Sequence, residues 1–463
     1  MTDPKDTQNA AGGTDGAENT AEETAESQAT LLATPADGVP DPITTPEELA
    51  EAVAKFAVGT GPVALDAERA SGYRYSQRAY LVQMRREGAG TLLIDPIALP
   101  DLHELNEAIC DAEWVLHAAN QDLPCLAEIG LVPTRLFDTE LAGRLLGDDR
   151  VALGTMVEQH LGIRLEKGHS AADWSQRPLP HEWLIYAALD VELLIQLRDV
   201  LAQQLADSGK EEWAEQEFET VRLAPPAAPK PERWRRTSGI HAVRTRRGLA
   251  SVRAMWQARD DYARKRDIAP GRILPDSAII SAARSNATTE EALAALPIFG
   301  GPRQSRHLGI WLRALASAAA LSDRDLPTMT ATPDAVPPTS RWKERSPEAA
   351  ERLARCRARI AELAEEYAVL GQNLLPSEVL RRLVWRLSEE KLVTAESTPS
   401  ADTVAAILTE LGARPWQIAM TTSALTEALA PPPETQTLTE AQTSPETPAP
   451  PPEVTEVPEP PAS

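Results

Sequence analysis

Short apolar runs bounded by turn residues predict the strands of the first half of the chain. VALDAE (63–68) follows Gly61-Pro62 and predicts a buried strand. AYLVQMRR (79–86) and GTLLID (90–95) flank Glu87-Gly88-Ala89, which predicts a hairpin, and EWVLHAA (113–119) predicts a further strand. Three strands of this kind, followed by an alternation of helices and strands, predict a mixed sheet with helices packed on it.

Apolar residues at helical spacing predict the helices of the same region. In residues 101–112 this spacing is set by Leu102, Leu105 and Ile109. Four further helical segments are expected at 121–129, 138–146, 152–161 and 180–207. Glycines stand where three of the helices should end, at Gly130, Gly147 and Gly162.

The second half of the chain has the pattern of helices alone. Apolar stripes predict long helices near 303–320 and 415–429. ILPD (273–276) and LLPS (374–377) lie 101 residues apart, and in each a proline precedes an expected N-cap residue, Asp276 or Ser377. We interpret the two helical pieces as weak repeats of each other.

Proline-rich segments divide the chain. RLAPPAAPKPER (222–233) holds four prolines, and a second break with few apolar anchors begins at residue 326. The expected organisation is a tail at 1–41, an α/β domain at 42–221, a linker at 222–233, a helical domain at 234–325, a linker at 326–345, a second helical domain at 346–430 and a tail at 431–463.

Composition places this organisation in a soluble protein of a reducing compartment. The 463 residues are 42% hydrophobic, which suffices for sizeable cores, and the three cysteines lack C-x-x-C spacing, which argues against disulfides and zinc. No run of 18 apolar residues is present, and the polar, acidic first residues are unlike a secretory signal. We therefore expect a cytoplasmic, monomeric protein that does not bind membranes.

Charge is distributed unevenly along the chain. Residues 1–45 carry −8 and residues 431–463 carry −6 of the total −23, with few large apolar residues, so both tails are expected to be disordered. Between Lys230 and Arg313, by contrast, 17 basic residues face seven acidic ones. This surplus favours a polyanion partner, although a solvated helical surface would carry the same charge. The candidate contacts are Arg244, Arg246, Arg247, Arg264, Lys265 and Arg266.

Acidic residues form the candidate chemical site. Asp66 and Glu68 lie two apart on a predicted strand and therefore share one face, where a divalent cation would relieve their repulsion. Asp122 opens a helix after a strand, and Tyr186 and Asp190 lie four apart on one helical face. Each feature alone has an ordinary explanation, such as a surface strand, a helix-dipole charge or a half-buried tyrosine.

In this order along the chain, the five residues resemble the DEDDy group of 3′-5′ exonucleases, and most closely the ribonuclease D family. The resemblance covers most of 60–205 and includes AYLVQ (79–83), LIDP (93–96), HAANQDL (117–123), FDTELAGRLLG (137–147) and ADWSQRPL (172–179). It implies an α/β ribonuclease H-like fold for the first domain. RKRDIAPGRILPDSAI (264–279) resembles an HRDC nucleic-acid-binding module, and 346–430 resembles a diverged second one, although its charge is −3 over 348–428.

The resemblance also implies a mechanism and a substrate. Two divalent ions, Mg²⁺ or Mn²⁺, would be held by the four acids: Asp66, Glu68 and Asp190 at the ion that binds the attacking water, Asp66 and Asp122 at the other. Tyr186 would orient that water. The expected substrate is RNA with a free 3′ end, such as a tRNA precursor, shortened to nucleoside 5′-monophosphates. Candidates for holding its terminal nucleotides are Gln83, His117 and Arg177, although a structural role is the more common one for each.

Three alternatives stay open on the sequence. The same chemistry could act on DNA, because a residue that reads the 2′-hydroxyl is not evident. The fold could serve a non-catalytic RNA-binding protein, or the chain could be an adaptor that acts through its tails. The intact set of five residues weighs against the last two. ATP is not expected as a ligand, because the chain lacks G-x-x-x-x-G-K-[ST].

Overall fold

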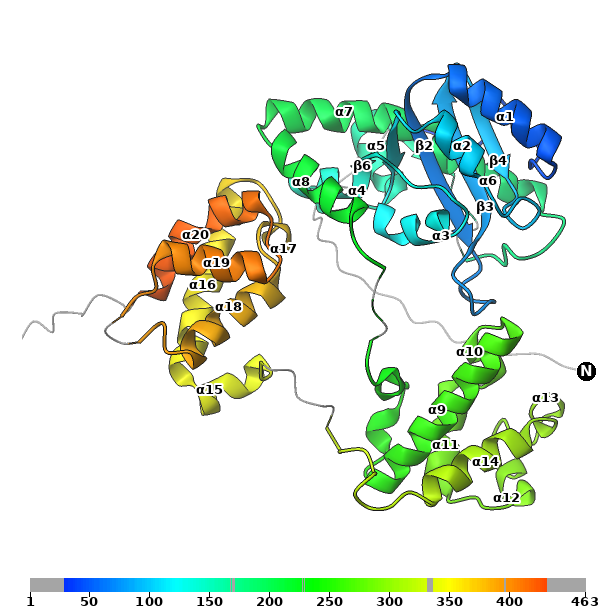
Figure 1. The fold of residues 1–463 in the computed structure, drawn as a ribbon, viewed down its shortest axis with the longest axis vertical. Helices are drawn as coiled ribbons and strands as arrows, with labels where there is room; N and C mark the ends of the chain where they lie inside the picture. The colour runs from blue at the N-terminus through cyan, green and yellow to red at the C-terminus, as the bar shows by residue number, and fades with distance from the viewer. Residues whose placement is uncertain are drawn as a thin grey trace, which may run out of the picture.

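The computed structural model describes residues 29–166, 168, 171–226, 228, 230–330, 336–394 and 397–430. Figure 1 shows three bodies, which we call the N-terminal part (30–222), the middle part (233–319) and the C-terminal part (339–429). Residues 1–28 of the first predicted tail and all of the second, 431–463, lie outside the described residues. Residues 29–41 were expected in the first tail, but β1 (Thr30–Leu32) pairs in parallel with β7 (Ile163–Leu165).

A five-stranded mixed sheet organises the N-terminal part and confirms the expected fold class. Its order is β4-β3-β2-β5-β6, with β2 in the centre. β2 pairs antiparallel with β3 and parallel with β5, and β5–β6 is also parallel. The strands are β2 (Thr60–Arg69), β3 (Ala79–Glu87), β4 (Gly90–Ile94), β5 (Glu113–Leu116) and β6 (Arg135–Asp138).

Helices pack against this sheet. They are α1 (Pro46–Val58), α2 (His103–Ala108), the 3₁₀ turn η1 (Ala119–Gln121), α3 (Leu123–Ala127), α4 (Thr139–Leu146), α5 (Leu153–Leu161), α6 (His181–Glu192), α7 (Leu194–Asp207) and α8 (Glu211–Arg222). The apolar pattern did not predict α1, α8 or β6, although a capping box between Thr45 and Glu48 marks the start of α1.

Three boundaries differ from the prediction. The strand expected at 113–119 ends at Leu116, because Ala118 adopts a left-handed φ of 58° and the chain turns into η1. The helix expected at 180–207 is two helices that meet at Leu193, and the helix expected at 101–112 spans six residues. Gly147 and Gly162 do cap α4 and α5, with φ of 90° and 67°.

The other two parts are helical, as expected. The middle part comprises η2 (Arg233–Arg236), η3 (Ile240–Ala242), α9 (Arg246–Arg266), α10 (Pro270–Ile273), α11 (Asp276–Ser285), α12 (Glu290–Ala294), α13 (Pro302–Ser305) and α14 (Leu308–Ala319). The C-terminal part comprises η4 (Thr339–Arg341), α15 (Trp342–Arg345), α16 (Pro347–Glu366), α17 (Gly371–Leu374), α18 (Ser377–Glu389), α19 (Ala401–Glu410) and α20 (Pro415–Leu429).

The repeat extends beyond the two short motifs. In both parts a long helix leads to a four-residue helix, α10 or α17, and then to the helix that the Pro-Asp or Pro-Ser pair opens. The N-cap is the proline in each case, so Asp276 and Ser377 are the first helical residues and not the expected N-caps. The linker expected at 326–345 contains α15, because the fully buried Trp342 anchors it.

The C-terminal part is packed tightly onto the N-terminal part. Trp213 of α8 stacks on Trp416 with ring centroids 4.7 Å apart, and the Trp416 indole donates to Glu217 at 3.0 Å. The Lys210 ammonium donates to the carbonyl of Ala368 at 3.0 Å. One apolar core is continuous across these two parts, whereas the middle part has its own. No helix in the described ranges has both the length and the apolar character needed to cross a membrane.

Candidate active site

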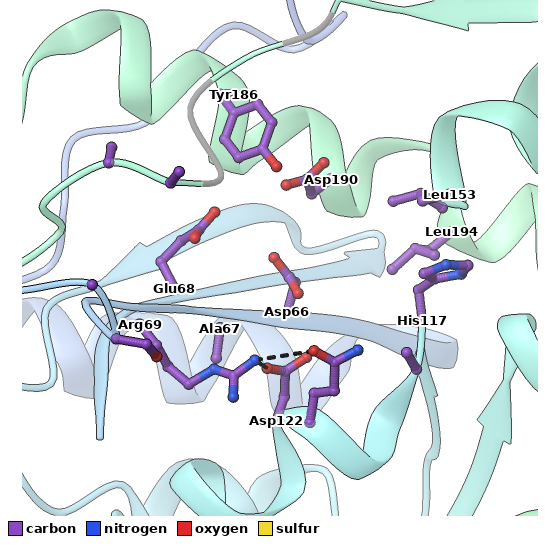
Figure 2. A pocket seen from close by; sticks show the side chains of 16 residues that line it. Asp66, Ala67, Glu68, Arg69, His117, Asp122, Leu153, Tyr186, Asp190 and Leu194 are labelled. Carbon is purple, nitrogen blue, oxygen red and sulfur yellow. Dashed lines mark hydrogen bonds and ion pairs between the residues drawn. The ribbon is translucent and has the colours of Figure 1, made fainter. Parts of the chain in front are cut away.

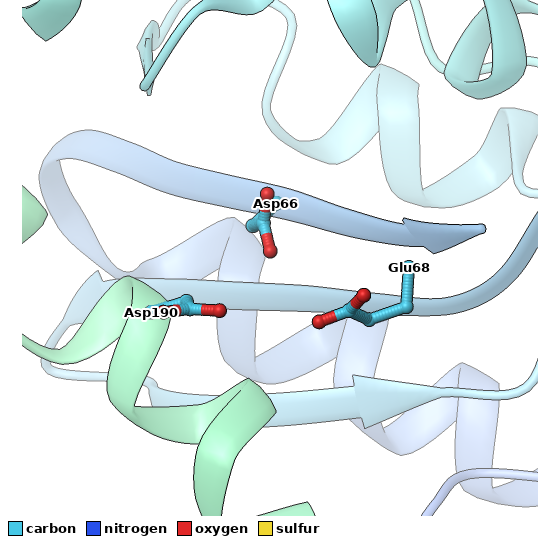
Figure 3. Close-up of side chains that lie close together, drawn as sticks. All are labelled: Asp66, Glu68 and Asp190. Carbon is cyan, nitrogen blue, oxygen red and sulfur yellow. The ribbon is translucent and has the colours of Figure 1, made fainter. Parts of the chain in front are cut away.

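Three carboxylates converge where β2 meets α6. Asp66 and Glu68 point to the same side of β2 because they are two residues apart, and Asp190 approaches from α6. One oxygen of each lies within 4.8 Å of the others (Figure 3). This spacing suits the shared coordination of a divalent metal ion.

Tyr186 and Asp122 complete the set of five residues predicted from the sequence. Tyr186 lies one helical turn before Asp190, and its hydroxyl bonds to that carboxylate and points toward the cluster (Figure 2). Asp122 lies across the cluster, directly before α3, and pairs with Arg69 at 3.4 Å. The structure brings all five together in one cavity of about 720 Å³.

Burial and mutual repulsion govern the protonation of these acids. The pKa of Glu68 is raised to about 10, first by burial and then by the neighbouring charges of Asp66, Asp190 and Asp122. The pKa values of those three aspartates are also raised, and burial is again the largest cause. A site of this kind binds protons at neutral pH when it holds no cation. The donor set therefore fits a divalent ion, which would take the place of those protons.

Asp138, which was not among the predicted site residues, holds the turn that carries His117 and Asp122. Its carboxylate accepts from the backbone amides of Ala118 at 3.1 Å and Ala119 at 2.8 Å, and it also caps α4. Burial raises the pKa of Asp138 to about 6 in spite of these bonds. Its position between a strand and a helix is an N-cap signal that could have identified it.

His117 is the one predicted nucleotide contact of the N-terminal part that lines the cavity. Its Nδ1 lies 2.9 Å from the Thr139 hydroxyl oxygen. Burial lowers the pKa of His117 to about 4, so the imidazole is neutral at physiological pH. A neutral ring offers a hydrogen bond without adding charge beside the acids.

Gln83 and Arg177 were also candidates for holding nucleotides, but neither is among the residues that line the cavity. Gln83 is fully buried on β3, and its amide donates to Asp66 at 3.4 Å. The guanidinium of Arg177 forms two bonds to Asp95, at 2.6 and 2.7 Å, and others to the carbonyls of Tyr80 and Trp174. These contacts indicate that Arg177 fastens the preceding loop to the sheet.

The predicted basic contacts of the middle part divide into two groups. Arg246 donates to backbone carbonyls after α14, Arg247 donates to such carbonyls and to Asp323, and Arg264 pairs with Asp260 of its own helix. All three therefore have partners within the protein, although Arg246 and Arg264 lie at exposed positions. The remaining three, Arg244, Lys265 and Arg266, are exposed as well, and no ion pair among the described residues involves them.

A second group of basic side chains was not predicted. Lys230, Arg233 and Arg236 line a hollow beside Trp256, with the Arg233 guanidinium 5.3 Å from the centre of the indole ring. None of the ion pairs found among the described residues involves these three cations. We call this group the basic hollow. This group could not be predicted from charge alone, because charge does not distinguish side chains that form ion pairs from those that do not.

Family models match all three parts. Residues 40–206 match a 3'-5' exonuclease, and residues 249–315 match an HRDC domain. Residues 335–429 match a 3' to 5' exonuclease C-terminal domain. Support for the HRDC-like character of the C-terminal part comes from the structural repeat described above.

Curated relatives of this chain are named ribonuclease D. A ribonuclease D of Sphingobium indicum is 31% identical over 293 residues, covering 62% of this chain and 74% of the relative. A ribonuclease D of Jannaschia sp. is 33% identical over 264 residues, covering 54% and 67%. The chain belongs to the ribonuclease D family. With its exonuclease domain, it is a 3′-5′ exoribonuclease.

Two solved structures have a fold similar to that of this chain. A protein from Bifidobacterium adolescentis is 37% identical, with a TM-score of 0.80 over 87% of this chain and 99% of that one. Escherichia coli RNase D, described as an exoribonuclease involved in structured RNA processing, is 24% identical with a TM-score of 0.58, over 80% of this chain and 98% of that one. The latter comparison shows a shared fold.

Proposed function

We propose that this enzyme trims the 3′ ends of structured RNA such as tRNA precursors, one nucleotide at a time, and releases nucleoside 5′-monophosphates. The observation that carries the proposal is the convergence of Asp66, Glu68 and Asp190 within 4.8 Å, beneath the hydroxyl of Tyr186, in an open cavity. A cavity of about 720 Å³ has room for a terminal nucleotide and its scissile phosphate.

Two divalent ions, Mg²⁺ or Mn²⁺, would be held by these three acids together with Asp122. When bound, such ions lower the pKa of water and stabilise charge on the attacked phosphate and on the leaving oxygen. Asp122 already lies beside a cation, Arg69, at 3.4 Å. We expect Arg69 to keep Asp122 oriented and to attract a phosphate of the substrate.

The other residues of the cavity would position the substrate. Burial raises the pKa of Tyr186, so its hydroxyl keeps its proton at neutral pH and acts as a hydrogen-bond partner that aligns water. Leu153 and Leu194 offer apolar contact to a base or sugar, and the neutral His117 lies next to them (Figure 2). The cavity is thus lined by the acidic residues on one side and by Leu153 and Leu194 on another.

The middle part would hold the RNA body. The support for this role is its surplus of basic residues and the basic hollow, where an aromatic face accompanies three cations. Arg244, Lys265 and Arg266 would add phosphate contacts from their exposed positions. We do not include Arg246, Arg247 and Arg264 among the proposed RNA contacts, because their main hydrogen-bond partners lie within the protein.

The test uses labelled RNA and DNA of one sequence, each with a free or a phosphorylated 3′ end, in EDTA, Mg²⁺ or Mn²⁺. The expected result is stepwise shortening of RNA with a free 3′ end, release of 5′-monophosphates, and no reaction in EDTA. Asp66→Asn should abolish the reaction, whereas Asp149→Asn, at an exposed position of the same part, should not. Wild-type rates for Asp66→Asn would overturn the site assignment, and equal rates on DNA would favour the DNA-directed alternative.

A further inference from the structure

The loop between β2 and β3 joins the active-site cavity to the middle part. It begins directly after Glu68 and Arg69, and two of its residues, Ser71 and Gly72, line the cavity. In Figure 1 this end of the β2–β3 hairpin points toward α10 of the middle part. One short segment therefore forms a wall of the cavity and extends to a separately folded domain.

The backbone of this loop is bonded to the start of α10. The Gly72 carbonyl accepts from Arg272 Nε at 2.8 Å, and the Tyr73 carbonyl accepts from the Ala269 amide at 2.9 Å. The Arg272 guanidinium also lies 3.8 Å from the centre of the Tyr73 ring. These interactions hold the residues that border the cavity.

The next residues of the loop are bonded to the C-terminal end of α9. Asp267 accepts from the Ser76 amide at 2.8 Å and from Arg78 at 3.2 Å. The Tyr75 hydroxyl donates to the buried Asp260 at 3.1 Å, and its ring packs against the core of the middle part. A residue of the N-terminal part therefore belongs to the packing of the middle part.

The opposite side of the loop contacts the aromatic cluster that supports Tyr186. Tyr73 packs against this cluster, in which Trp174 lies 6.4 Å from Tyr186 between ring centres. Arg74 Nε donates to the Ser175 hydroxyl at 2.8 Å. The loop is consequently clamped between the residues around Tyr186 and the middle part.

We propose that the middle part is a positioning element of the active site, and that Asp267 and Arg272 act through the loop to fix the Ser71–Gly72 wall. Removal of these interactions should lower turnover even of substrates too short to reach the middle part. The inference rests on the exonuclease activity of the cavity and does not depend on which RNA is the natural substrate.

Asp267 gives the sharpest test, because an acidic residue is not expected to attract RNA. A purely RNA-binding role for the middle part predicts that Asp267→Ala leaves RNA affinity unchanged or improves it. If the middle part instead positions the active-site loop, Asp267→Ala should lower kcat. Asp267 has a φ of 48°, a conformation that asparagine tolerates, so Asp267→Asn should keep the backbone and one acceptor and restore most of the rate.

The experiment measures kcat and KM of the full chain on a single-stranded RNA tetranucleotide and on a folded RNA. Asp267→Ala should lower kcat on the tetranucleotide roughly tenfold, because small displacements from productive geometry are costly. Tyr75→Phe, which removes the bond to Asp260 from the other side of the interface, should change kcat in the same direction. Arg284→Ala is the matched control, since Arg284 is exposed on α11 and no hydrogen bond or ion pair joins it to the described residues of the N-terminal part.

Thermal unfolding of each variant separates positioning from loss of fold. A lower kcat at a temperature where the variant remains fully folded supports the proposal. The proposal is overturned if Asp267→Ala and Tyr75→Phe keep wild-type kcat on the tetranucleotide, or if they change only KM on the folded RNA.

Discussion

Glu68→Gln should stabilise the enzyme in the absence of metal, because the clustered acids oppose folding. The pKa of Glu68 is raised from its ordinary 4.5 to about 10 by burial and by three neighbouring aspartates. At pH 7 the unfolded chain carries this glutamate ionised, whereas the metal-free fold keeps it protonated. Folding then costs the free energy of holding that proton.

The magnitude follows from the pKa difference. At pH 7 the solution lies about 2.5 pH units above 4.5, and each unit corresponds to about 1.4 kcal/mol. The cost is therefore at most about 3.5 kcal/mol, and hydration of the open cavity reduces it to about 1–3 kcal/mol, which is also the expected gain from Glu68→Gln. For a unit of this size the gain corresponds to a rise in Tm of roughly 3–10 °C.

The pH dependence has a definite sign. A raised pKa means that the folded state binds more protons than the unfolded state between about pH 4.5 and about pH 10. Wild-type stability in EDTA should therefore fall as pH rises through this range, and the advantage of Glu68→Gln should grow. With saturating divalent metal the wild type should be more stable than Glu68→Gln, because metal binding stabilises the folded wild type and the amide binds the metal much more weakly.

The assay is thermal unfolding in EDTA from about pH 5 to about pH 9, repeated with saturating Mg²⁺. Glu128→Gln, at an exposed position of the same part, is the control and should leave Tm unchanged. A Tm for Glu68→Gln in EDTA that is lower than wild type, or a difference that is constant with pH, would refute the account of mutual repulsion.

Further predictions concern the other residues. Tyr186→Phe should lower kcat by about 10²–10⁴-fold without changing Mg²⁺ binding measured by calorimetry, and an unchanged kcat would assign Tyr186 to packing. Replacing Lys230, Arg233 and Arg236 by alanine should reduce the slope of log affinity against log salt on folded RNA by roughly 0.7 for each phosphate that these side chains neutralise; equal slopes would remove the basic hollow from the interface. Trp416→Ala should destabilise the protein by about 3–5 kcal/mol in urea unfolding, and a cost below about 1 kcal/mol would contradict the packing argument.

The carboxylate cluster could be predicted from the sequence because its members are related by local periodicity. Asp66 and Glu68 share a face through the two-residue repeat of a strand, and Tyr186 and Asp190 through the helical turn. The strand patterns around them identified the mixed sheet for the same reason. Asp122 could be assigned to the site only through the family resemblance, because acidic residues are common at strand-to-helix turns for other reasons, such as the helix dipole.

Long-range partners could not be predicted in this way. Arg246 and Arg247 contribute to the basic surplus, yet backbone carbonyls some 75 residues away engage them. Arg177 was a candidate substrate contact on the sequence. In the structure it forms two hydrogen bonds to Asp95, which lies 82 residues away in the chain. Periodicity reports which face a residue occupies, and it contains no information about a partner on a distant element.

The two helical parts meet the N-terminal part in physically different ways, and this difference assigns them different roles. The C-terminal part shares a continuous apolar core with α8, which resists separation because large apolar surfaces would be exposed. The middle part has its own core and meets the cavity loop mainly through hydrogen bonds and ring contacts. Polar interfaces between separate cores are the ones that allow relative motion of domains. We therefore expect any coupling between RNA held at a distance and the chemistry of Asp66 to pass through the middle part, whereas the C-terminal part rigidly supports the N-terminal part.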